Sequence, residues 1–204
     1  MARVRSKNPR GRGAELRGEL VAAANAVLDE TGDPSSVTVR GVAGAVGVAP
    51  NAVYLHFADR EELLAAVMVD RFTEFGDRIR AAVDAAGADA LAALRAGHRA
   101  YIDFALEHPG HYRLLFGPGE VRPERPDLAE QVLSVAFAAF ELCVGLCRRG
   151  VEADVFAPVD PEQLARSIWA MEHGYADLAR TERGGLLPDP DTILDTILAA
   201  AAPR

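Results

Sequence analysis

Residues 38–67, TVRGVAGAVGVAPNAVYLHFADREELLAAV, constrain the fold more than any other stretch of the chain. After Thr38, apolar side chains recur at i, i+3, i+4 and i+7, which predicts a short helix with one apolar face and the Thr38 hydroxyl as its N-cap. Gly47 can adopt the left-handed conformation that ends a helix in a sharp turn. Pro50 is favoured in a first helical turn and predicts a second short helix that continues to about His56.

The second predicted helix carries hydrogen-bonding side chains on its outer face. Ala52 and Val53 face inward, which leaves Asn51, Tyr54 and His56 on the polar side. A helix of about two turns is thin enough to enter a DNA major groove about 12 Å wide. This pair of helices is therefore typical of a helix-turn-helix that reads DNA.

A capping box follows the motif. Asp59 can cap the next helix, and Glu62 stands three residues later, as the box requires. The apolar spacing after it predicts a long amphipathic helix. This helix would connect the small DNA-binding part to the rest of the chain.

The motif resembles the DNA-binding domain of the TetR family of transcriptional regulators. The matching residues are Thr38, Gly47-Val48, Tyr54-Leu55-His56-Phe57 and Asp59-Arg60-Glu61-Glu62-Leu63-Leu64. Arg60 stands where the family usually has lysine and keeps the positive charge. Asn51-Ala52 stands where Gly-Thr or Pro-Thr is common, so the operator sequence cannot be transferred from relatives. The resemblance implies an N-terminal three-helix DNA-binding domain.

The predicted DNA contacts combine exposed positions of the motif with positions that the family uses. They are Thr38, Arg40, Ala49, Pro50, Asn51, Tyr54, His56 and Arg60. The phenol and the imidazole can donate to phosphates on the groove wall, while Asn51 approaches base edges. Both arginines offer positive charge to phosphates. The alternative is that Tyr54 and His56 pack within an ordinary helix pair and that Arg40 is a surface charge.

The charge of the chain is uneven. Residues 1–60 carry eight basic and six acidic side chains, a net charge of +2, whereas all 204 residues carry −8, so the remainder carries −10. Phosphate repulsion then restricts DNA to the N-terminal end. The first twelve residues hold five basic side chains and no acidic one: Arg3, Arg5, Lys7, Arg10 and Arg12. We expect a solvated terminus that can order against phosphates or in the adjacent minor groove.

Composition predicts an all-α protein in the cytoplasm. Aromatic residues make up 6%, alanine is abundant and strand-like alternation is missing. The N-terminus lacks the apolar region of a signal peptide. The most apolar stretch, residues 132–147, contains Ser134 and Glu141 and is shorter than a bilayer span requires, so no membrane partner is expected.

Two cysteines and several histidines raise the possibility of a metal or thiol sensor. Cys143 and Cys147 share a helix face, and His98, His108 and His111 are further donors. Free cysteines are more often buried as small apolar residues, and no Cys-x-x-Cys spacing occurs. We therefore expect no metal site and no cofactor.

About nine helices are expected along the chain. Their approximate ranges are 13–32, 38–46, 50–56, 59–86, 89–108, 112–116, 127–149, 161–181 and a last helix from 190. The predicted domains are 1–58, with the basic arm and the helix-turn-helix, and 59–204, for ligand binding and dimerisation. In the second half, His108-Pro109 with Tyr112 to Phe116 resembles a helix junction of the family. Trp169 with His173-Gly174 resembles its Trp-His-Gly (WHG) subgroup.

The family resemblance implies a small-molecule pocket in the second domain. A dimer is expected because one recognition helix of about two turns reads only a few base pairs. The candidate pocket residues are Phe72, Phe75, Tyr101, Phe104, Phe116, Phe137, Phe140, Trp169 and His173. Such aromatic stripes are also common in ordinary cores. The composition suits a largely apolar ligand. The candidate dimer residues lie on the last two helices and are Leu164, Ile168, Tyr175, Leu178, Ile193, Leu194, Ile197 and Leu198.

The sequence thus predicts a DNA-binding transcriptional regulator. The expected form is a homodimeric repressor that binds a palindromic operator and is released by an unknown small-molecule inducer. The first alternative is a ligand-binding or scaffolding helical protein without operator recognition. An enzyme is not expected, because no nucleophile–base pair, phosphate loop or metal spacing occurs.

Overall fold

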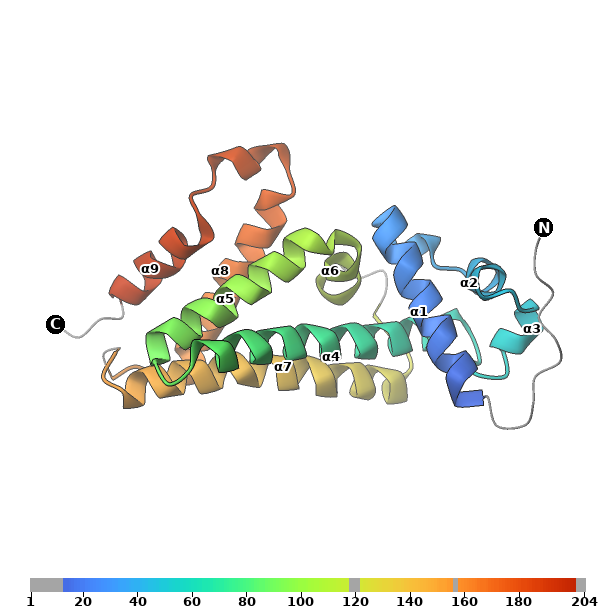
Figure 1. The fold of residues 1–204 in the computed structure, drawn as a ribbon, viewed down its shortest axis with the longest axis horizontal. Coiled ribbons are helices and arrows are strands. Elements are labelled where there is room, and N and C mark those ends of the chain that lie inside the picture. The colour runs from blue at the N-terminus through green and yellow to red at the C-terminus, as the bar shows by residue number, and fades with distance from the viewer. Residues whose placement is uncertain (1–12, 118–121, 156–157, 201–204) are drawn as a thin grey trace. The chain divides into compact units, whose positions relative to one another are not determined.

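The computed structural model describes residues 13–117, 122–155 and 158–200, which form helices joined by turns, with no strand in these ranges (Figure 1). The α-helices are α1 Gly13–Thr31, α2 Val39–Val46, α3 Pro50–Val53, α4 Arg60–Ala86, α5 Ala90–Glu107, α6 Pro109–Phe116, α7 Pro126–Glu152, α8 Pro161–Ala179 and α9 Pro190–Ala200. Two 3₁₀-helices, η1 Pro34–Ser36 and η2 Glu182–Leu186, lie between them. The predicted all-α class and the predicted number of helices are confirmed for the described residues.

The described residues divide into two compact units. Unit 1 comprises those within 1–72 and 108–135, and unit 2 comprises those within 73–107 and 136–204. Helices α4 and α7 each contribute to both units. The predicted functional domains, 1–58 and 59–204, follow sequence motifs instead of packing, and their boundary stays a prediction.

In unit 1, α1 packs against α2 and against α6. Fully buried apolar side chains hold α1 to the helix-turn-helix, because each lies on an inward helix face; they include Leu20, Leu28, Val42, Ala43 and Val53. The Thr38 hydroxyl accepts a hydrogen bond of 3.0 Å from the Gly41 N–H, and Gly47 ends α2 with φ 76°. The predicted cap and turn are therefore present.

The start of α4 has the predicted Asp59 cap in a variant of the capping box, in which Glu62 bonds back to the residue before the cap. The Asp59 carboxylate accepts from the Glu62 N–H at 2.8 Å, and the Glu62 carboxylate accepts from the Ala58 N–H at 2.8 Å. These bonds satisfy amide groups that a helix start would otherwise leave to water. They fix the direction in which the long helix leaves the helix-turn-helix.

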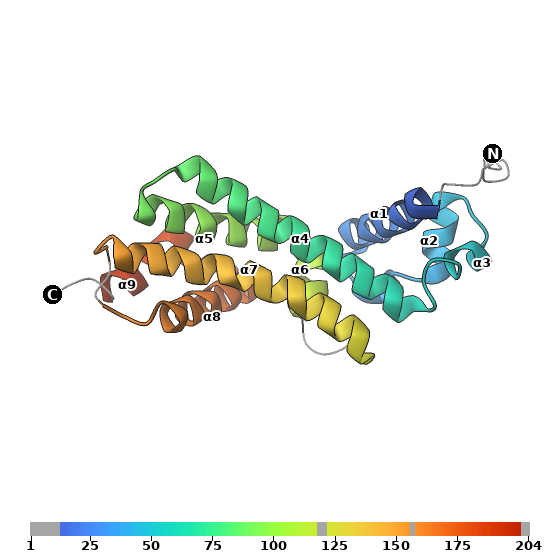
Figure 2. The same ribbon diagram turned by 90° about the horizontal axis from the view of Figure 1, so that it is seen from below.

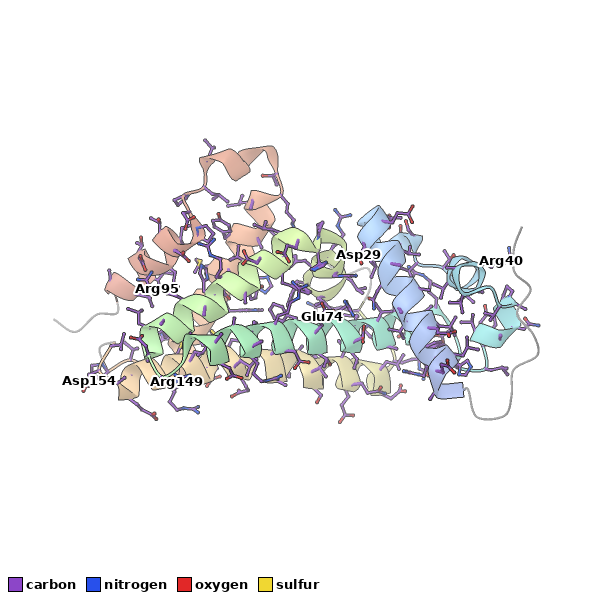
Figure 3. All side chains as sticks on the ribbon, in the orientation of Figure 1. Asp29, Arg40, Glu74, Arg95, Arg149 and Asp154 are labelled. Atoms are coloured by element: carbon purple, nitrogen blue, oxygen red, sulfur yellow. The ribbon has the colours of Figure 1, made fainter. Side chains whose placement is uncertain are left out.

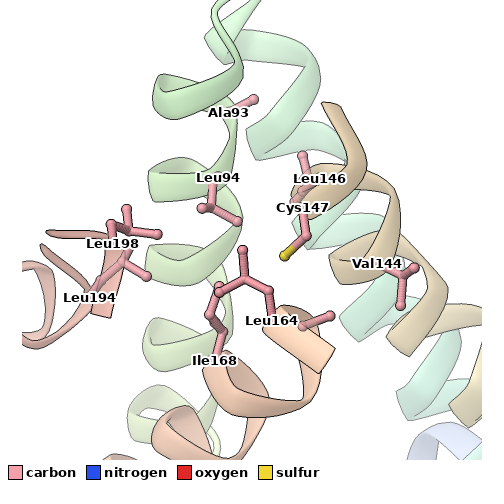
Figure 4. Close-up of a cluster of buried hydrophobic side chains, with 10 residues drawn as sticks. Ala93, Leu94, Val144, Leu146, Cys147, Leu164, Ile168, Leu194 and Leu198 are labelled. Carbon is pink, nitrogen blue, oxygen red and sulfur yellow. The ribbon is translucent and has the colours of Figure 1, made fainter. Parts of the chain in front are cut away.

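In unit 2 the core forms where α5, α7, α8 and α9 meet, as Figure 4 shows. Its buried residues are Ala93, Leu94, Val144, Leu146, Cys147, Leu164, Ala165, Ile168, Leu194 and Leu198. Gly97 on α5 allows a close approach, since an added Cβ would lie 3.0 Å from Leu146 Cδ1. Burial of these side chains stabilises the unit by about 25 cal/mol per Å² of apolar surface removed from water.

Three helix boundaries differ from the prediction by three residues, and the others differ by two or fewer. Helix α3 is regular only to Val53, and residues 54–56 continue as a turn. Helix α6 begins at Pro109 rather than at Tyr112, because proline occupies its first turn. Helix α7 runs through the buried Gly150 to Glu152. Glycine alone did not stop α7, since a helical glycine costs only about 1 kcal/mol and packing outweighs it.

Helix α7 is unusually apolar. By length and composition this helix could cross a membrane. Of its most apolar 18-residue stretch, 28% is buried within the chain. This finding departs from the predicted shortness of the apolar stretch. In unit 2, α7 lies against α8 (Figure 2). The Cys143 thiol of α7 is 4.0 Å from the Ala165 carbonyl oxygen of α8. The helix therefore serves the core on one side and exposes apolar surface on another.

Candidate nucleic-acid interface and effector site

The helix-turn-helix presents a polar, exposed surface formed by α2, the turn and α3. Arg40, in the first turn of α2, is exposed and is labelled in Figure 3. Ala49, Pro50 and Asn51 are exposed at the start of α3. The Ala49 N-cap has no side-chain hydrogen bond. Backbone N–H groups at a helix start can donate hydrogen bonds to a phosphate oxygen, so this end of α3 can approach DNA closely.

Tyr54 and His56 follow α3 in the turn. Tyr54 has 53% of its surface exposed and His56 is half-buried, whereas Val53 and Phe57 beside them are buried. The alternative in which Tyr54 packs in the core is not what the structure shows. An exposed phenol held by two buried neighbours can reach a phosphate at little entropic cost.

Leu55 is an exposed residue that the sequence reasoning did not single out. Its side chain is 82% exposed, between Tyr54 and His56. A large apolar side chain on a surface of this kind can contact the methyl group of thymine in a major groove. The sequence does contain a signal for this residue, because Leu55 is apolar although it lies between Tyr54 and His56 on the face predicted to be polar.

Arg60 has a different environment from the one predicted. Its Nε donates to the Val37 carbonyl at 2.6 Å, and one terminal nitrogen donates to the Pro34 carbonyl at 2.7 Å. The side chain thus braces the connection between α1 and α2 from the first turn of α4. Its contact with a phosphate stays a prediction, and it can involve only the donors that these carbonyls do not take.

The predicted basic arm, Arg3 to Arg12, lies outside the described residues. Its attachment point is described: α1 begins at Gly13, where an added Cβ would lie 3.8 Å from His56 Cε1. The described chain therefore begins directly beside the candidate DNA-binding surface.

In unit 2, six of the predicted pocket residues form a continuous series of ring contacts. They are Phe75 from α4, Tyr101 and Phe104 from α5, Phe140 from α7, and Trp169 and His173 from α8. The ring centroids of Phe75 and Tyr101 are 5.2 Å apart, and those of Trp169 and His173 are 4.5 Å apart. Residues separated by nearly 100 positions in sequence are thereby brought together.

A polar pair lies within this aromatic series. The Tyr101 hydroxyl is 3.1 Å from His173 Nδ1. Burial lowers the pKa of His173 from its ordinary 6.5 to about 4, against an opposing effect of Asp177, so the imidazole is neutral at pH 7. A neutral imidazole and a phenol among rings are the sort of few polar groups that orient an apolar ligand in a pocket.

The other three predicted pocket residues lie elsewhere. Phe72 and Phe116 contact each other in unit 1, with centroids 5.4 Å apart. Phe137 is 64% exposed. Helical spacing alone could not separate these residues from the series, because each side of a long helix faces a different neighbour.

The predicted dimer residues need a correction. Leu164, Ile168, Leu194 and Leu198 are buried in the core of a single chain, so their side chains are not available to a second copy. Tyr175 is half-buried and donates to the Pro188 carbonyl at 3.2 Å. Ile193 and Ile197 are half-buried, and Leu178 remains exposed. The apolar stripes on α8 and α9 pack within the chain because those helices complete the core with α5.

Among the described residues, neither cysteine belongs to the group of possible metal ligands that lie close together. Hydrogen bonding from Cys147 and burial raise the pKa of the Cys143 thiol well above its ordinary value, which disfavours a reactive thiolate. His98 is buried between the Glu172 carboxylate and the Pro190 carbonyl, each at 3.1 Å. Among the described residues, His108 and His111 instead lie beside Asp29.

Comparison with known proteins matches both halves of the chain. The family model of bacterial regulatory proteins of the tetR family matches residues 20–67. The model of the tetracyclin repressor-like C-terminal domain matches residues 94–201, which is just over half of the chain.

The chain is also similar to individual regulators. HTH-type transcriptional regulator Rv1816 of Mycobacterium tuberculosis is 30% identical over 110 residues, which cover 52% of this chain and 46% of that protein. The chain thus matches about half the length of the curated relatives. A protein of unknown function from Rhodococcus sp. RHA1 has a TM-score of 0.82 at 28% identity and covers 97% of this chain and 100% of its own.

The ketosteroid transcriptional regulator KstR2 of Mycobacterium tuberculosis shares the fold, with a TM-score of 0.65 at 21% identity over 99% of this chain and 100% of its own. The tetR family model covers the capped α2 and the glycine turn of unit 1. The chain therefore belongs to the TetR family of transcriptional regulators, as both family models and the fold show.

Proposed function

We propose that the protein is a homodimeric repressor that binds a near-palindromic operator and releases it when a small molecule binds in unit 2. The observation that carries the DNA-binding part is the exposed row of Arg40, Asn51 and Tyr54, held by the buried Val53 and Phe57. Exposed donors on a rigid frame suit phosphate and base contacts.

A dimer follows from the small size of the reading surface. One short recognition helix contacts only a few base pairs, so useful discrimination needs a second copy about 34–36 Å along the duplex, or a multiple of that distance. A two-fold axis in the protein then matches a palindromic operator.

The surface that we propose for the dimer is the outer face of α7 and α8 in unit 2. Phe137 on α7 is 64% exposed, and Trp169 and Leu178 on α8 are 41% and 40% exposed. Gly174 on α8 has open space around it, which would allow a second backbone to approach closely. Exposed large apolar side chains together with small residues favour helix packing between two chains.

The proposed inducer is a largely apolar small molecule. The series of rings from Phe75 to Trp169 supplies apolar walls, and the pair of Tyr101 and His173 supplies polar groups that can orient a single hydroxyl or carbonyl group. Separation of packed rings by a ligand would change the positions of the helices that carry them.

Helix α4 is the element that we propose to couple ligand and DNA. This one continuous helix carries Phe75 of the ring series and Arg60, which braces the helix-turn-helix. A ligand that favours one position of α4 weakens DNA binding that requires another, by linkage. Structures with and without ligand should show a changed separation of the two Tyr54 residues of the dimer; an unchanged separation contradicts this coupling.

Two other functions compete with the proposal. A ligand-binding or scaffolding protein would bind no specific DNA. An enzyme would turn over a metabolite, which steady-state assays would detect. The exposed Arg40, Asn51 and Tyr54 support DNA recognition over both.

The deciding experiment is fluorescence anisotropy of the purified protein with DNA from directly upstream of its gene, across a salt series. Saturable, specific binding is expected. Tyr54→Ala should lose at least about tenfold in affinity, and Arg40→Ala should reduce the salt slope by about 1 per contacted phosphate.

The matched control is Arg148→Ala, which removes an exposed arginine from α7 of unit 2. It should leave both the affinity and the salt slope unchanged. Absence of specific binding by a folded dimer to any fragment of the neighbouring DNA would favour the scaffolding alternative. Equal losses for Arg40→Ala and Arg148→Ala would show that the contact surface is not the helix-turn-helix.

A further inference from the structure

Three possible metal ligands converge in unit 1, outside the DNA-binding surface and the aromatic series. Asp29 lies near the C-terminal end of α1, beside α6 (Figure 3). His108 is the N-cap residue of α6, and His111 lies in its first turn. One ligand atom from each of the three side chains can be chosen so that all lie within 4.8 Å of one another.

The buried His111 has a defined arrangement of donor and acceptor nitrogens. Its Nε2 is 3.4 Å from the Asn25 carbonyl oxygen, an acceptor, so Nε2 carries the proton. In the neutral ring, Nδ1 then carries the lone pair. The side chain is 1% exposed, and Nδ1 has no hydrogen-bond partner. A buried acceptor without a donor is costly, by about 1–3 kcal/mol in general.

The lone pair of His111 Nδ1 lies beside the Asp29 carboxylate, whose oxygen is also a hydrogen-bond acceptor. His111 Nδ1 is 3.7 Å from Asp29 Oδ1, which is too long for a hydrogen bond. His108 Nδ1 is 3.5 Å from the same oxygen. A lone pair that faces a carboxylate is unfavourable unless a cation lies between them. The arrangement therefore points to a cation.

We propose that Asp29, His108 and His111 bind a divalent transition-metal ion, with Zn²⁺ as the best fit. Zinc bonds to imidazole nitrogen and carboxylate oxygen are about 2.0–2.2 Å, so two ligand atoms at a tetrahedral angle lie about 3.4 Å apart. The two nitrogen–oxygen distances of 3.5 Å and 3.7 Å are close to that value. Only small side-chain adjustments are needed.

The surroundings also suit a metal. The hydrogen bond from His111 Nε2 to a backbone carbonyl is the outer contact that commonly orients a metal-binding histidine. The Asp29 side chain is 55% exposed and that of His108 is 24% exposed, so an ion can enter from solvent and water can complete its coordination. Two imidazoles with one carboxylate is a donor set that zinc accepts.

A protonated His111 paired with Asp29 is the other explanation for the geometry. Burial is the main cause that lowers the pKa of His111, and the charges of Arg71 and His108 lower it further, against the opposing effects of Asp29 and Asn25. The distance of 3.7 Å between His111 Nδ1 and the Asp29 oxygen is also longer than the hydrogen bond that a charged pair would form. A metal ion between the two atoms fits this distance better than a proton does.

The proposed ion would fasten α1 to α6. These helices already pack closely, since a Cβ added to Gly110 would lie 2.4 Å from the Leu28 carbonyl oxygen. Because α1 also packs against α2, the ion would stabilise the frame of the helix-turn-helix. The site departs from the sequence expectation of no metal, and it stands independently of the proposed repressor function and of its inducer.

The test uses the full chain after treatment with a chelator and removal of the chelator. Titration with Zn²⁺ by calorimetry should show one ion per chain, and Co²⁺ should give the visible absorption of a four-coordinate site. Asp29→Asn and His108→Gln should each weaken zinc binding by more than about 100-fold. His111→Leu should abolish binding while the protein remains folded, because leucine suits the buried position.

The matched control is Glu30→Gln, which removes one negative charge from the exposed residue next to Asp29. It should bind zinc like the unchanged protein. Zinc binding that is equally weak in Glu30→Gln and Asp29→Asn would indicate general attraction by surface carboxylates and overturn the proposal. So would the absence of stoichiometric binding, or binding that survives His108→Gln and His111→Leu. None of these readouts depends on DNA.

Discussion

The helix-turn-helix of unit 1 and the core of unit 2 satisfy their polar groups over different distances in sequence. Thr38 accepts from an N–H three residues away, and Asp59 does the same. In unit 2, His98 pairs with Glu172, 74 residues away, and with the Pro190 carbonyl, 92 residues away. A local cap forms together with its helix, whereas a distant pair requires the assembled unit. Single substitutions of polar residues should therefore lower the unfolding free energy little in the helix-turn-helix and much in unit 2.

The largest effect is expected for the buried pair. His98→Leu or Glu172→Leu leaves one buried polar partner unpaired, which should cost about 3–5 kcal/mol of unfolding free energy. The double substitution should recover part of that loss. The measurement is urea unfolding at fixed protein concentration. Arg95→Ala, which removes an exposed ion pair with Asp195, is the control and should cost less than about 1 kcal/mol. Equal losses of unfolding free energy for the buried pair and for the exposed pair would contradict the expected difference.

A distant contact in unit 1 should be the next most sensitive. Gly110→Ala places a Cβ 2.4 Å from the Leu28 carbonyl oxygen and should cost about 1–3 kcal/mol or more. Gly18→Ala on α1, where nothing lies within 4 Å, should be neutral or stabilising. Thermal unfolding of both variants would show whether the loss of stability depends on how far apart in sequence the contacting residues are, rather than on the unit that contains them. Similar midpoints for the two variants would contradict this view.

Two glycines of the helix-turn-helix provide a test of local effects alone. Neither has a neighbour within 4 Å of an added Cβ, but Gly47 has φ 76°. Gly47→Ala should cost about 1–2 kcal/mol because L-residues are strained there. Gly44→Ala, inside α2, should stabilise by about 0.5–1 kcal/mol. Urea unfolding of this pair checks the sign; a destabilising Gly44→Ala would mean that Gly44 serves a contact outside the single chain.

The smallest effect concerns pH. His173 has a pKa of about 4 in the folded chain against an ordinary 6.5, so between these values the unfolded chain binds the proton that the folded chain excludes. Its contribution to stability is complete above pH 6.5 and is lost as the pH falls towards 4. After allowance for partial exposure, the loss should be about 1 kcal/mol.

His173→Gln keeps a hydrogen-bonding partner for Tyr101 and has no proton to bind. The difference in unfolding free energy between His173→Gln and the unchanged protein should therefore vary between pH 6.5 and 4 and be constant above pH 7. A difference that does not vary with pH would show that the ring is not kept neutral by burial.

The features that the sequence could predict are those whose partners lie close by in the chain. The Thr38 cap, the Gly47 turn and the Asp59 capping box depend on neighbours within four residues, so their patterns are visible in the chain. The exposure of Arg40 and Tyr54 followed from the same periodicity. Local rules therefore predicted most of the candidate DNA-binding surface.

The features that sequence reasoning missed or assigned to another role depend on tertiary packing. Leu164 and Leu194 carry the apolar pattern of an interface, yet that pattern serves the core of one chain. Arg60 finds the Pro34 carbonyl 26 residues away. Asp29 is 79 residues from His108, and no motif joins them. An apolar stripe predicts that a face is covered, but it does not predict which chain covers it.

The start of α1 beside His56 has a consequence for how the preceding residues act. The five basic side chains before Gly13 lie within twelve residues of this point in sequence. We propose that, once the helix-turn-helix has bound DNA, phosphates meet these charges at an effective concentration in the millimolar range, which the length of the connecting chain sets. Weak individual contacts can then slow the dissociation of the complex without adding any preference for sequence.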